Sequence, residues 1–223
     1  MRAALLLALV CGLAVPAAVA AERPVVVELF TSQGCSSCPP ADAVLAELAK
    51  RADVLPLGFH ISYWDNLGWK DPFSREASTE RQKQYARRLG EGQIYTPQMV
   101  VEGTREMIGS RRGEVFAAID HARPQAAAPV TFADDRRSVT IGPGRGEGKV
   151  FLVRFVRQRA TQIAAGENAR RAANDSNAVT DLAALGQWNG AAVKFPIGPP
   201  APGEGIAVLV QGENGSFLGA SAL

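Results

Sequence analysis

Short apolar runs alternate with amphipathic segments through the first half of the chain. Residues 25–30 are almost continuously apolar and rich in β-branched side chains, which is typical of a strand buried on both faces. In residues 41–50 the apolar positions return every three or four residues, which predicts an amphipathic helix. A second apolar run follows at residues 54–60. Because one helix separates the two strands, we expect them to pair in parallel.

The same alternation continues to about residue 122. After a polar and aromatic insertion, the pattern predicts a helix at residues 78–89, a hairpin whose strands lie within residues 94–101 and 106–108, and a helix at residues 113–121. Glu102-Gly103-Thr104 supplies the hairpin turn. Residues 24–122 are therefore predicted to form one α/β domain of order β-α-β-α-β-β-α.

The pattern changes after residue 122. Residues 123–129 are rich in Pro and Ala and are interpreted as a linker, and short alternating runs separated by glycine-rich turns follow. The expected strands are residues 130–133, 138–141, 150–157, 161–164, 193–195, 206–210 and 217–218. Residues 166–185 are expected to be helix or loop. Residues 130–223 are thus predicted to be a second, smaller, β-rich domain with a sandwich-like architecture.

The first twenty residues have the pattern of a secretory signal. Arg2 precedes an apolar run that ends at Pro16, and Ala18-Val19-Ala20 supplies the small residues of a cleavage site. We expect cleavage after Ala20 and a periplasmic or secreted protein. The apolar run is too short to span a bilayer, so no transmembrane segment is expected in the mature chain.

Charge and cysteine content narrow the classes of function. The 223 residues include 24 Lys and Arg against 22 Asp and Glu, a net charge of +2, which gives no electrostatic reason to expect nucleic-acid binding. The chain has three cysteines, and Cys11 would leave with the signal. The mature protein would keep only Cys35 and Cys38.

The pair Cys35-Ser36-Ser37-Cys38 follows the first strand and precedes the first helix. A sulfur at a helix start faces unpaired backbone N–H groups and the positive end of the helix dipole, which lower a thiol pKa and favour the nucleophilic thiolate. We expect Cys35 to be the nucleophile and the more exposed sulfur, and Cys38 the resolving thiol. The alternative is an inert disulfide, although so short a loop yields only about 2 kcal/mol against about 3 for a 15-residue loop.

These motifs carry a resemblance to a known superfamily. The element order and the position of the Cys-x-x-Cys resemble thioredoxin. More narrowly, the chain resembles a family of secreted bacterial thioredoxin-like proteins of unknown function in residues 30–40 (FTSQGCSSCPP), 63–65 (YWD), 67–73 (LGWKDPF) and 95–98 (YTPQ). The resemblance implies a thioredoxin-like fold and a cis bond at Thr96-Pro97 beside the sulfurs. It also implies that Thr96 pairs with substrate backbone and that its hydroxyl approaches the thiolate.

Trp64 and Asp65 follow the second strand, at the edge where open parallel sheets place ligand crevices. This position makes both residues candidates for substrate binding. Asp65, or Asp42 one turn into the helix, is a candidate acceptor for the Cys38 proton. The alternative is that Trp64 and its aromatic neighbours form a satellite apolar cluster under a long loop.

The function predicted from these residues is thiol–disulfide exchange with a disulfide or dithiol on a partner protein, with catalytic residues Cys35, Cys38 and Pro97 and no cofactor. One alternative is a binding module that retains the fold and a structural disulfide. A second is copper binding, because thiolates together with the imidazole of His60 suit copper. The sequence does not predict the direction of electron transfer or the oligomeric state.

Overall fold

The computed structural model describes residues 23–89, 92–122, 124 and 127–223. The expected signal at residues 1–20, with Cys11, lies outside the described residues, as does part of the expected linker at 123–129.

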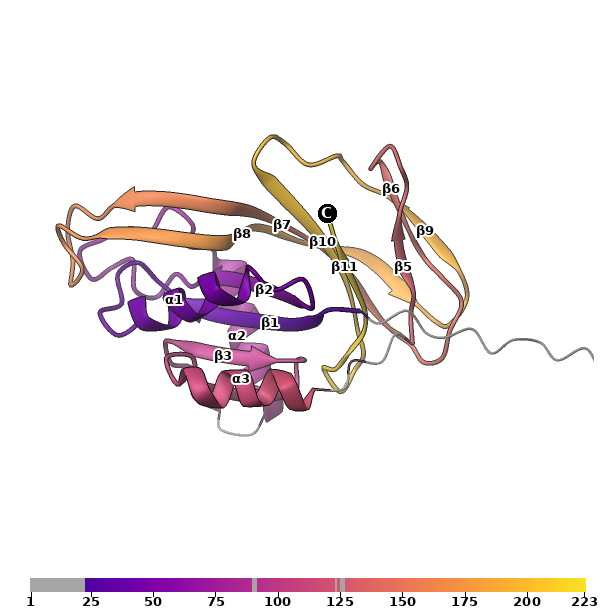
Figure 1. Ribbon diagram of the computed structural model, residues 1–223, viewed down its shortest axis with the longest axis horizontal. Coiled ribbons are helices and arrows are strands. Elements are labelled where there is room, and N and C mark those ends of the chain that lie inside the picture. Colours follow the sequence, from indigo (N-terminus) through magenta and orange to yellow (C-terminus); the bar gives the residue numbers. More distant parts are fainter. Residues whose placement is uncertain (1–22, 90–91, 123, 125–126) are drawn as a thin grey trace, which may run out of the picture.

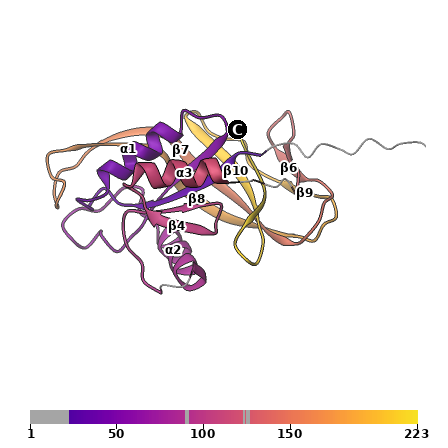
Figure 2. The same cartoon turned by 60° about the horizontal axis from the view of Figure 1, so that its bottom comes forward.

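The first seven elements occur in the order predicted from the sequence. They are β1 (Val25–Thr31), α1 (Pro39–Leu48), β2 (Val54–His60), α2 (Glu76–Leu89), β3 (Gln98–Val101), β4 (Arg105–Ile108) and α3 (Arg112–His121). β1 pairs in parallel with β2, as the single intervening helix favours, and antiparallel with β3. Helices α1 and α3 lie side by side on one face of these strands, while α2 lies apart from them (Figure 2).

The C-terminal strands do not form a separate sandwich as predicted. They are β5 (Val130–Phe132), β6 (Ser138–Ile141), β7 (Gly148–Gln162), β8 (Ala172–Trp188), β9 (Val193–Pro196), β10 (Glu204–Gln211) and β11 (Phe217–Ala222). Four of them continue the first sheet, which has eight strands in the order β11-β10-β7-β8-β2-β1-β3-β4. Only β5, β6 and β9 form a second, small sheet, which lies at the far end of the molecule from the β7–β8 turn (Figure 1).

The long hairpin β7–β8 corrects two sequence predictions. The strands expected at residues 150–157 and 161–164 are one strand, and most of the segment expected to be helix or loop at 166–185 is β8. Ala, Asn and Asp are frequent in β8 and disfavour a strand by propensity. Pairing with β7 from Trp188 to Ala172 overrides that preference.

Three apolar clusters hold the layers together. One lies between α1, α3 and the first strands and includes Leu29, Leu45 and Ile119. A second covers the α2 face and mixes residues of both halves of the chain, such as Phe30 and Phe155. The third packs the small sheet against β7, β8 and β10. The two halves therefore share one sheet and one continuous core face.

A buried polar joint reinforces this union of the halves. The Arg81 guanidinium on α2 donates to both carboxylate oxygens of Glu28 on β1, at 2.6 and 3.1 Å. It also lies within 3.4 Å of Gln211 Oε1 on β10, and the Tyr85 hydroxyl donates to Glu28 as well. All four side chains are buried, so the ion pair is compensated within the core.

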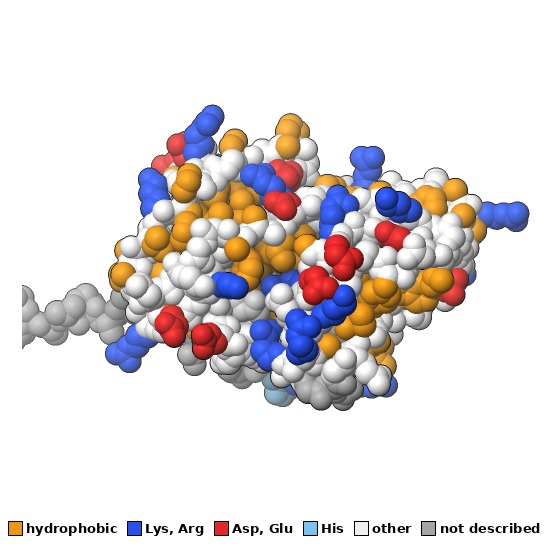
Figure 3. Space-filling view, turned by 180° about the vertical axis from the view of Figure 1, so that it is seen from behind, with side chains coloured by type: hydrophobic (Ala, Val, Ile, Leu, Met, Phe, Trp, Pro, Cys, Tyr) orange, Lys and Arg blue, Asp and Glu red, His pale blue; other side chains and the backbone are white. Residues whose placement is uncertain are grey.

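The surface is mixed in charge. On the face shown in Figure 3, Lys and Arg side chains lie among Asp and Glu side chains, with apolar side chains between them. No helix among the described residues is long and apolar enough to cross a membrane.

Candidate functional site around Cys35 and Cys38

The two cysteines lie at the start of α1 and are joined as a disulfide. Cys38 is the N-cap of the helix, and Pro39 and Pro40 occupy its first turn, where the missing N–H groups cost nothing. The Cys38 N–H donates to the carbonyl of Cys35 at 3.2 Å, which closes the loop into a turn, and the two Cα atoms are 5.4 Å apart.

A cis peptide bond lies beside the disulfide. It joins Thr96 and Pro97, as predicted. The Thr96 hydroxyl donates toward Cys35 Sγ at 3.4 Å and accepts from Trp64 Nε1 at 2.9 Å. The Gly109 N–H donates to the Pro97 carbonyl. Glycine suits the close packing at this position, because a Cβ there would lie 2.9 Å from Leu29. The structure therefore brings Trp64, Thr96 and Pro97 to the cysteine pair.

Both sulfur-bearing side chains are fully buried, at 0 % exposure. The expectation that Cys35 is the more exposed of the two is therefore wrong. Ser36 and Ser37 between them are exposed. A partner molecule can reach the loop backbone at these serines, but not the sulfurs without a local rearrangement.

The turn of the β7–β8 hairpin, residues 163–171 (the hairpin tip), bonds directly to the cysteine loop. The buried Asn168 amide donates to the carbonyl of Gln33 at 3.0 Å and to the carbonyl of Cys35 at 2.8 Å. Glu167 Oε2 accepts from the backbone N–H of Ser36 at 3.1 Å. Residues more than 130 positions away in sequence thus complete the site.

The segment 62–73 (the aromatic loop) meets the same region from the other side. Trp69 Nε1 donates to Gln33 Oε1 at 3.0 Å. The two loops also touch at Gly166, where φ is +77° and a Cβ would lie 3.1 Å from the Cβ of Trp69. Glycine is required at this contact because it fits both the backbone angle and the space.

A buried cluster of charged groups lies behind the loop. His60 Nδ1 is 2.7 Å from Asp71 Oδ2, and His60 Nε2 is 3.8 Å from Asp175 Oδ1. Asp71 also accepts from the Gln33 N–H at 2.7 Å, and the Gln33 amide donates to Asp175 at 2.7 Å. Gln33, two residues before Cys35, is therefore bonded to both partners of His60.

Burial alone would lower the pKa of His60, but the carboxylates of Asp71, Asp175 and Asp42 outweigh it and raise this pKa to about 9. For Asp71, burial raises the pKa, yet the His60 charge and hydrogen bond hold it below its ordinary value. Burial raises the pKa of Asp175 against the opposing effect of His60. At neutral pH the cluster therefore carries a cationic imidazole.

Asp42 lies in the first turn of α1, next to the disulfide in sequence. Its Oδ1 accepts from the Thr31 hydroxyl at 2.7 Å. Burial raises the pKa of Asp42 to about 7, although that hydrogen bond and the His60 charge act to lower it. A carboxyl group with this pKa can both accept and release a proton near neutral pH.

Comparison with known proteins places this chain in a family. A family model described as "Protein of unknown function (DUF1223)" matches residues 26–211, most of the chain. The chain belongs to the DUF1223 family. The matched residues include both the cysteine pair and the hairpin tip.

Two solved structures are similar to this DUF1223 protein. The X-ray structure of protein AGR_C_4864 from Agrobacterium tumefaciens is 33% identical, with a TM-score of 0.76, and the match covers 91% of this chain and 95% of that one. HBP35 of Porphyromonas gingivalis is 15% identical, with a TM-score of 0.55, covering 91% of this chain and 75% of that chain, and so resembles it in fold alone. No curated protein gave a match.

Asp65 of the DUF1223 chain bonds to the aromatic loop rather than to the cysteine loop. Its carboxylate accepts from the Asp71 N–H at 3.2 Å and from the Ser74 hydroxyl at 2.6 Å. These two bonds hold the C-terminal end of the aromatic loop. Tyr63 and Trp64 pack against the second core cluster. Trp64 thus combines packing with its bond to Thr96.

Sequence reasoning missed Glu167, Asn168, Gln33 and Asp175. No local pattern distinguishes them, since Glu167 and Asn168 lie in a segment expected to be helix or loop. Only a prediction that β7 and β8 form one long hairpin beside β2 would have placed the hairpin tip over the cysteines.

The residues described in this DUF1223 structure contain no group of three His, Cys, Asp or Glu side chains arranged to hold a metal ion. Both ring nitrogens of His60 face carboxylates. The His60 imidazole therefore lies between the carboxylates of Asp71 and Asp175.

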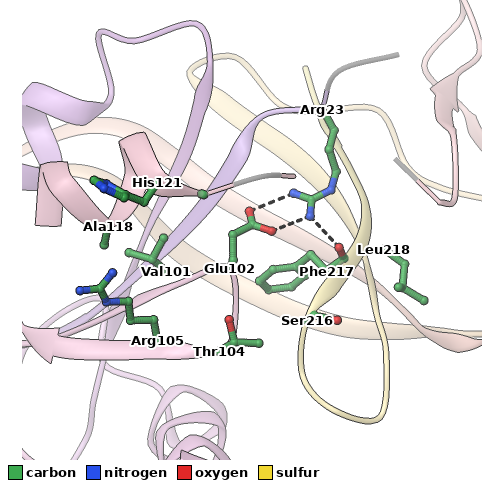
Figure 4. Close-up of a pocket in the computed structure, with 11 residues that line it drawn as sticks. Arg23, Val101, Glu102, Thr104, Arg105, Ala118, His121, Ser216, Phe217 and Leu218 are labelled. Carbon is green, nitrogen blue, oxygen red and sulfur yellow. Dashed lines mark hydrogen bonds and ion pairs between the residues drawn. The ribbon is translucent and has the colours of Figure 1, made fainter. Parts of the chain in front are cut away.

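Among the cavities in the described part of the DUF1223 chain, one adjoins the cysteine loop and another lies at the start of β1. One of about 570 Å³ lies between α1 and the β7–β8 hairpin, and Asp42, Gln33 and Asn168 line it. The other, of about 330 Å³, lies by the β3–β4 turn, where Arg23 forms an ion pair with Glu102 and donates to the carbonyl of Phe217 (Figure 4). The second cavity shares no lining residue with the first, and Arg23 ties the start of β1 to the β3–β4 turn through Glu102 and to β11 through the Phe217 carbonyl.

Proposed function

We propose that this chain is a thioredoxin-like protein that exchanges electrons with a dithiol or disulfide of a partner protein through Cys35 and Cys38. The observation that carries the proposal is the Thr96 hydroxyl at 3.4 Å from Cys35 Sγ, next to a cis proline. A pair that served only as a staple has no need of a hydroxyl donor at one sulfur. The order of the first seven elements and the N-cap position of Cys38 also support the proposal.

The exchange conserves electrons through a mixed disulfide. A thiolate of a reduced partner attacks Cys35 Sγ, the Cys35–Cys38 bond breaks, and Cys38 leaves as a thiolate. A second thiolate of the partner then attacks the mixed disulfide, which releases the Cys35 thiolate and an oxidised partner. The reverse sequence reduces a partner disulfide. In both directions Cys38 must gain or lose one proton.

Asp42 is the group proposed to exchange that proton. It lies one helical turn beyond Cys38, and its pKa of about 7 suits both transfer directions. The adjoining cavity, which Asp42 lines, gives water access to the carboxyl group.

The proposed partner presents an extended segment at Thr96. The Thr96 carbonyl accepts from the exposed hydroxyl of Ser37 at 3.4 Å, so this backbone lies beside the exposed part of the cysteine loop. Trp64 supplies an aromatic wall beside it through its bond to Thr96. The signal-like pattern of the first twenty residues supports a proposed location in the periplasm or outside the cell, where disulfides persist.

Mixed-disulfide trapping tests the proposal. Cys38→Ser leaves Cys35 as a nucleophile without a resolving thiol, so partner proteins should accumulate as adducts that disappear on reduction. Cys35→Ser and the double variant are matched controls and should trap no partner. Absence of any adduct with Cys38→Ser in the producing cells would contradict the proposal.

A second candidate function follows from the burial of both sulfurs. A binding module with a permanently closed disulfide would show the same 0 % exposure. The reduction potential separates the two candidates: a disulfide that resists buffers of the thioredoxin range, about −270 mV, is a structural bridge. A pair that titrates within the range of known oxidoreductases supports exchange.

A further inference from the structure

The hairpin tip places a carboxylate on the cysteine loop itself. Glu167 Oε2 accepts from the N–H of Ser36, the residue that follows Cys35, at 3.1 Å. Asn168 anchors the tip through its two bonds to the loop carbonyls, and its side chain is buried. Asn168 therefore anchors the backbone of the tip, and the exposed Glu167 carboxylate is tied to the cysteine loop by its bond to Ser36.

We propose that Glu167 is a positioning residue that biases the Cys35–Cys38 pair toward the disulfide. The inference rests on the proposed function for its biological meaning, but its physical content concerns only the two redox states of this chain. It assigns to the C-terminal half of the protein a direct part in setting the redox equilibrium.

The reason is electrostatic. A thiolate at Cys35 is stabilised by neighbouring backbone N–H groups, and Ser36, the next residue along the chain, lies in the same turn between Cys35 and Cys38. In the structure Glu167 already accepts from the Ser36 N–H. Its negative charge also opposes a second negative charge nearby. Both effects destabilise the reduced, thiolate-bearing state and leave the disulfide, which has no charge, unaffected.

Other charged groups also surround the loop. They are Asp42 on α1, the His60, Asp71 and Asp175 cluster behind Gln33, and Arg171, which donates to Asn168 Oδ1. All of these groups stay unchanged when only Glu167 is substituted. Glu167→Gln keeps an oxygen that can accept from Ser36 and removes only the charge.

The test measures the redox equilibrium in dithiothreitol buffers at pH 8. In this reaction two electrons and two protons pass from dithiothreitol to the cysteine pair, and dithiothreitol closes to its cyclic disulfide. We expect Glu167→Gln to shift the equilibrium constant about three- to tenfold toward the dithiol, and the shift to shrink in 1 M salt. In the reduced protein the same variant should react faster with iodoacetamide.

Asp181→Asn is the matched control. Asp181 is exposed and lies on the same hairpin, ten residues beyond Arg171, or about 30 Å along the strand. It should leave the equilibrium unchanged although the net charge changes equally. An unchanged equilibrium in Glu167→Gln, or an equal shift in Asp181→Asn, would overturn the proposal.

The outcome is distinguishable from failure of the proposed function. If the wild-type pair is reduced only at the extreme of the dithiothreitol range and traps no partner, thiol exchange is wrong. The comparison between Glu167→Gln and wild type remains measurable in the same buffers and still decides the role of Glu167.

Discussion

Single buried charges set the chemistry behind the cysteine loop. His60 is 3% exposed and lies between Asp71 and Asp175, so one cation offsets carboxylates that would otherwise be buried together. Because Gln33 bonds to both carboxylates, the protonation state of His60 is linked to the backbone just before Cys35. His60, at the end of β2, thus acts as the counter-ion of the buried carboxylates behind the cysteine loop.

Loss of the His60 charge should destabilise the protein in a pH-dependent way. The pKa of His60 rises from 6.5 to about 9 on folding, so the stabilisation is complete below about pH 6.5 and is lost as the pH rises through about 9. The free energy of unfolding of the wild type should fall by about 3 kcal/mol between these limits.

In His60→Gln this part of the pH dependence should disappear. The variant should be less stable than wild type by about 3 kcal/mol at pH 6.5, because two buried carboxylates lose their cation. Urea unfolding at several pH values measures both effects. If the free energy of unfolding had the same pH dependence in wild type and His60→Gln, His60 would not be charged in the folded state.

The β7–β8 hairpin is the element that closes the site. Its strands pair from Gly148 with Trp188 to Gln162 with Ala172, and this length carries the hairpin tip past α1 to the cysteine loop (Figure 1). Two bonds from Asn168 join the tip to the loop. Local separation of the tip is therefore the smallest movement expected to uncover Cys35.

Asn168→Ala should make the disulfide more accessible. The variant loses both bonds to the loop carbonyls, so we expect dithiothreitol to reduce the disulfide about thirtyfold faster than in wild type, because each lost bond contributes about 1 kcal/mol. The rate is measured by quenched alkylation of free thiols.

Asn174→Ala, an exposed position on the same hairpin, is the control and should keep the wild-type rate. If Asn168→Ala were reduced no faster than this control, the hairpin tip would not limit access to the sulfurs.

At the scale of the molecule, the two halves of the chain are joined through the core. Arg81 and Glu28 connect α2 to β1, and Gln211 adds β10 to the same buried group. Asn177 on β8 also donates to the carbonyl of Pro56 on β2 at 2.8 Å. The eight-stranded sheet is continuous across the two halves of the chain.

Arg81→Met should therefore destabilise the whole protein by about 3–5 kcal/mol, since it leaves Glu28 buried without its cation. Adding Glu28→Gln should recover much of that loss, because the uncompensated charge is then removed. Lys83→Met, which breaks an exposed ion pair with Glu80, should cost less than about 1 kcal/mol. Chemical denaturation of wild type and the three variants measures these differences. A free energy of unfolding of Arg81→Met equal to that of wild type would contradict the role of the buried polar joint.

The sequence predicts local features of this fold well. Hydrophobic period and turn chemistry identify β1, β2 and the Glu102-Gly103 turn, where both residues have positive φ as a tight hairpin turn demands. The positions of Cys35, Thr96 and Pro97 are predictable for two reasons. They flank strands and a helix whose hydrophobic periodicity is clear, and they resemble the motif positions of thioredoxin.

Long-range pairing is what the sequence does not reveal. The position of β8 beside β2 depends on contacts between segments more than 100 residues apart, such as Gly58 with Ala178. Its composition of Ala, Asn and Asp favours other structures locally. Asn168 and Glu167 consequently become recognisable as site residues only when the hairpin is placed.

The separation in sequence between the cysteines and the hairpin tip has a consequence for biosynthesis. The chain is made from its N-terminus, so Cys35 and Cys38 are synthesised about 130 residues before Glu167 and Asn168. During that interval nothing from the hairpin can shield the thiols. The hairpin can therefore cover the cysteine loop only after most of the chain has been made.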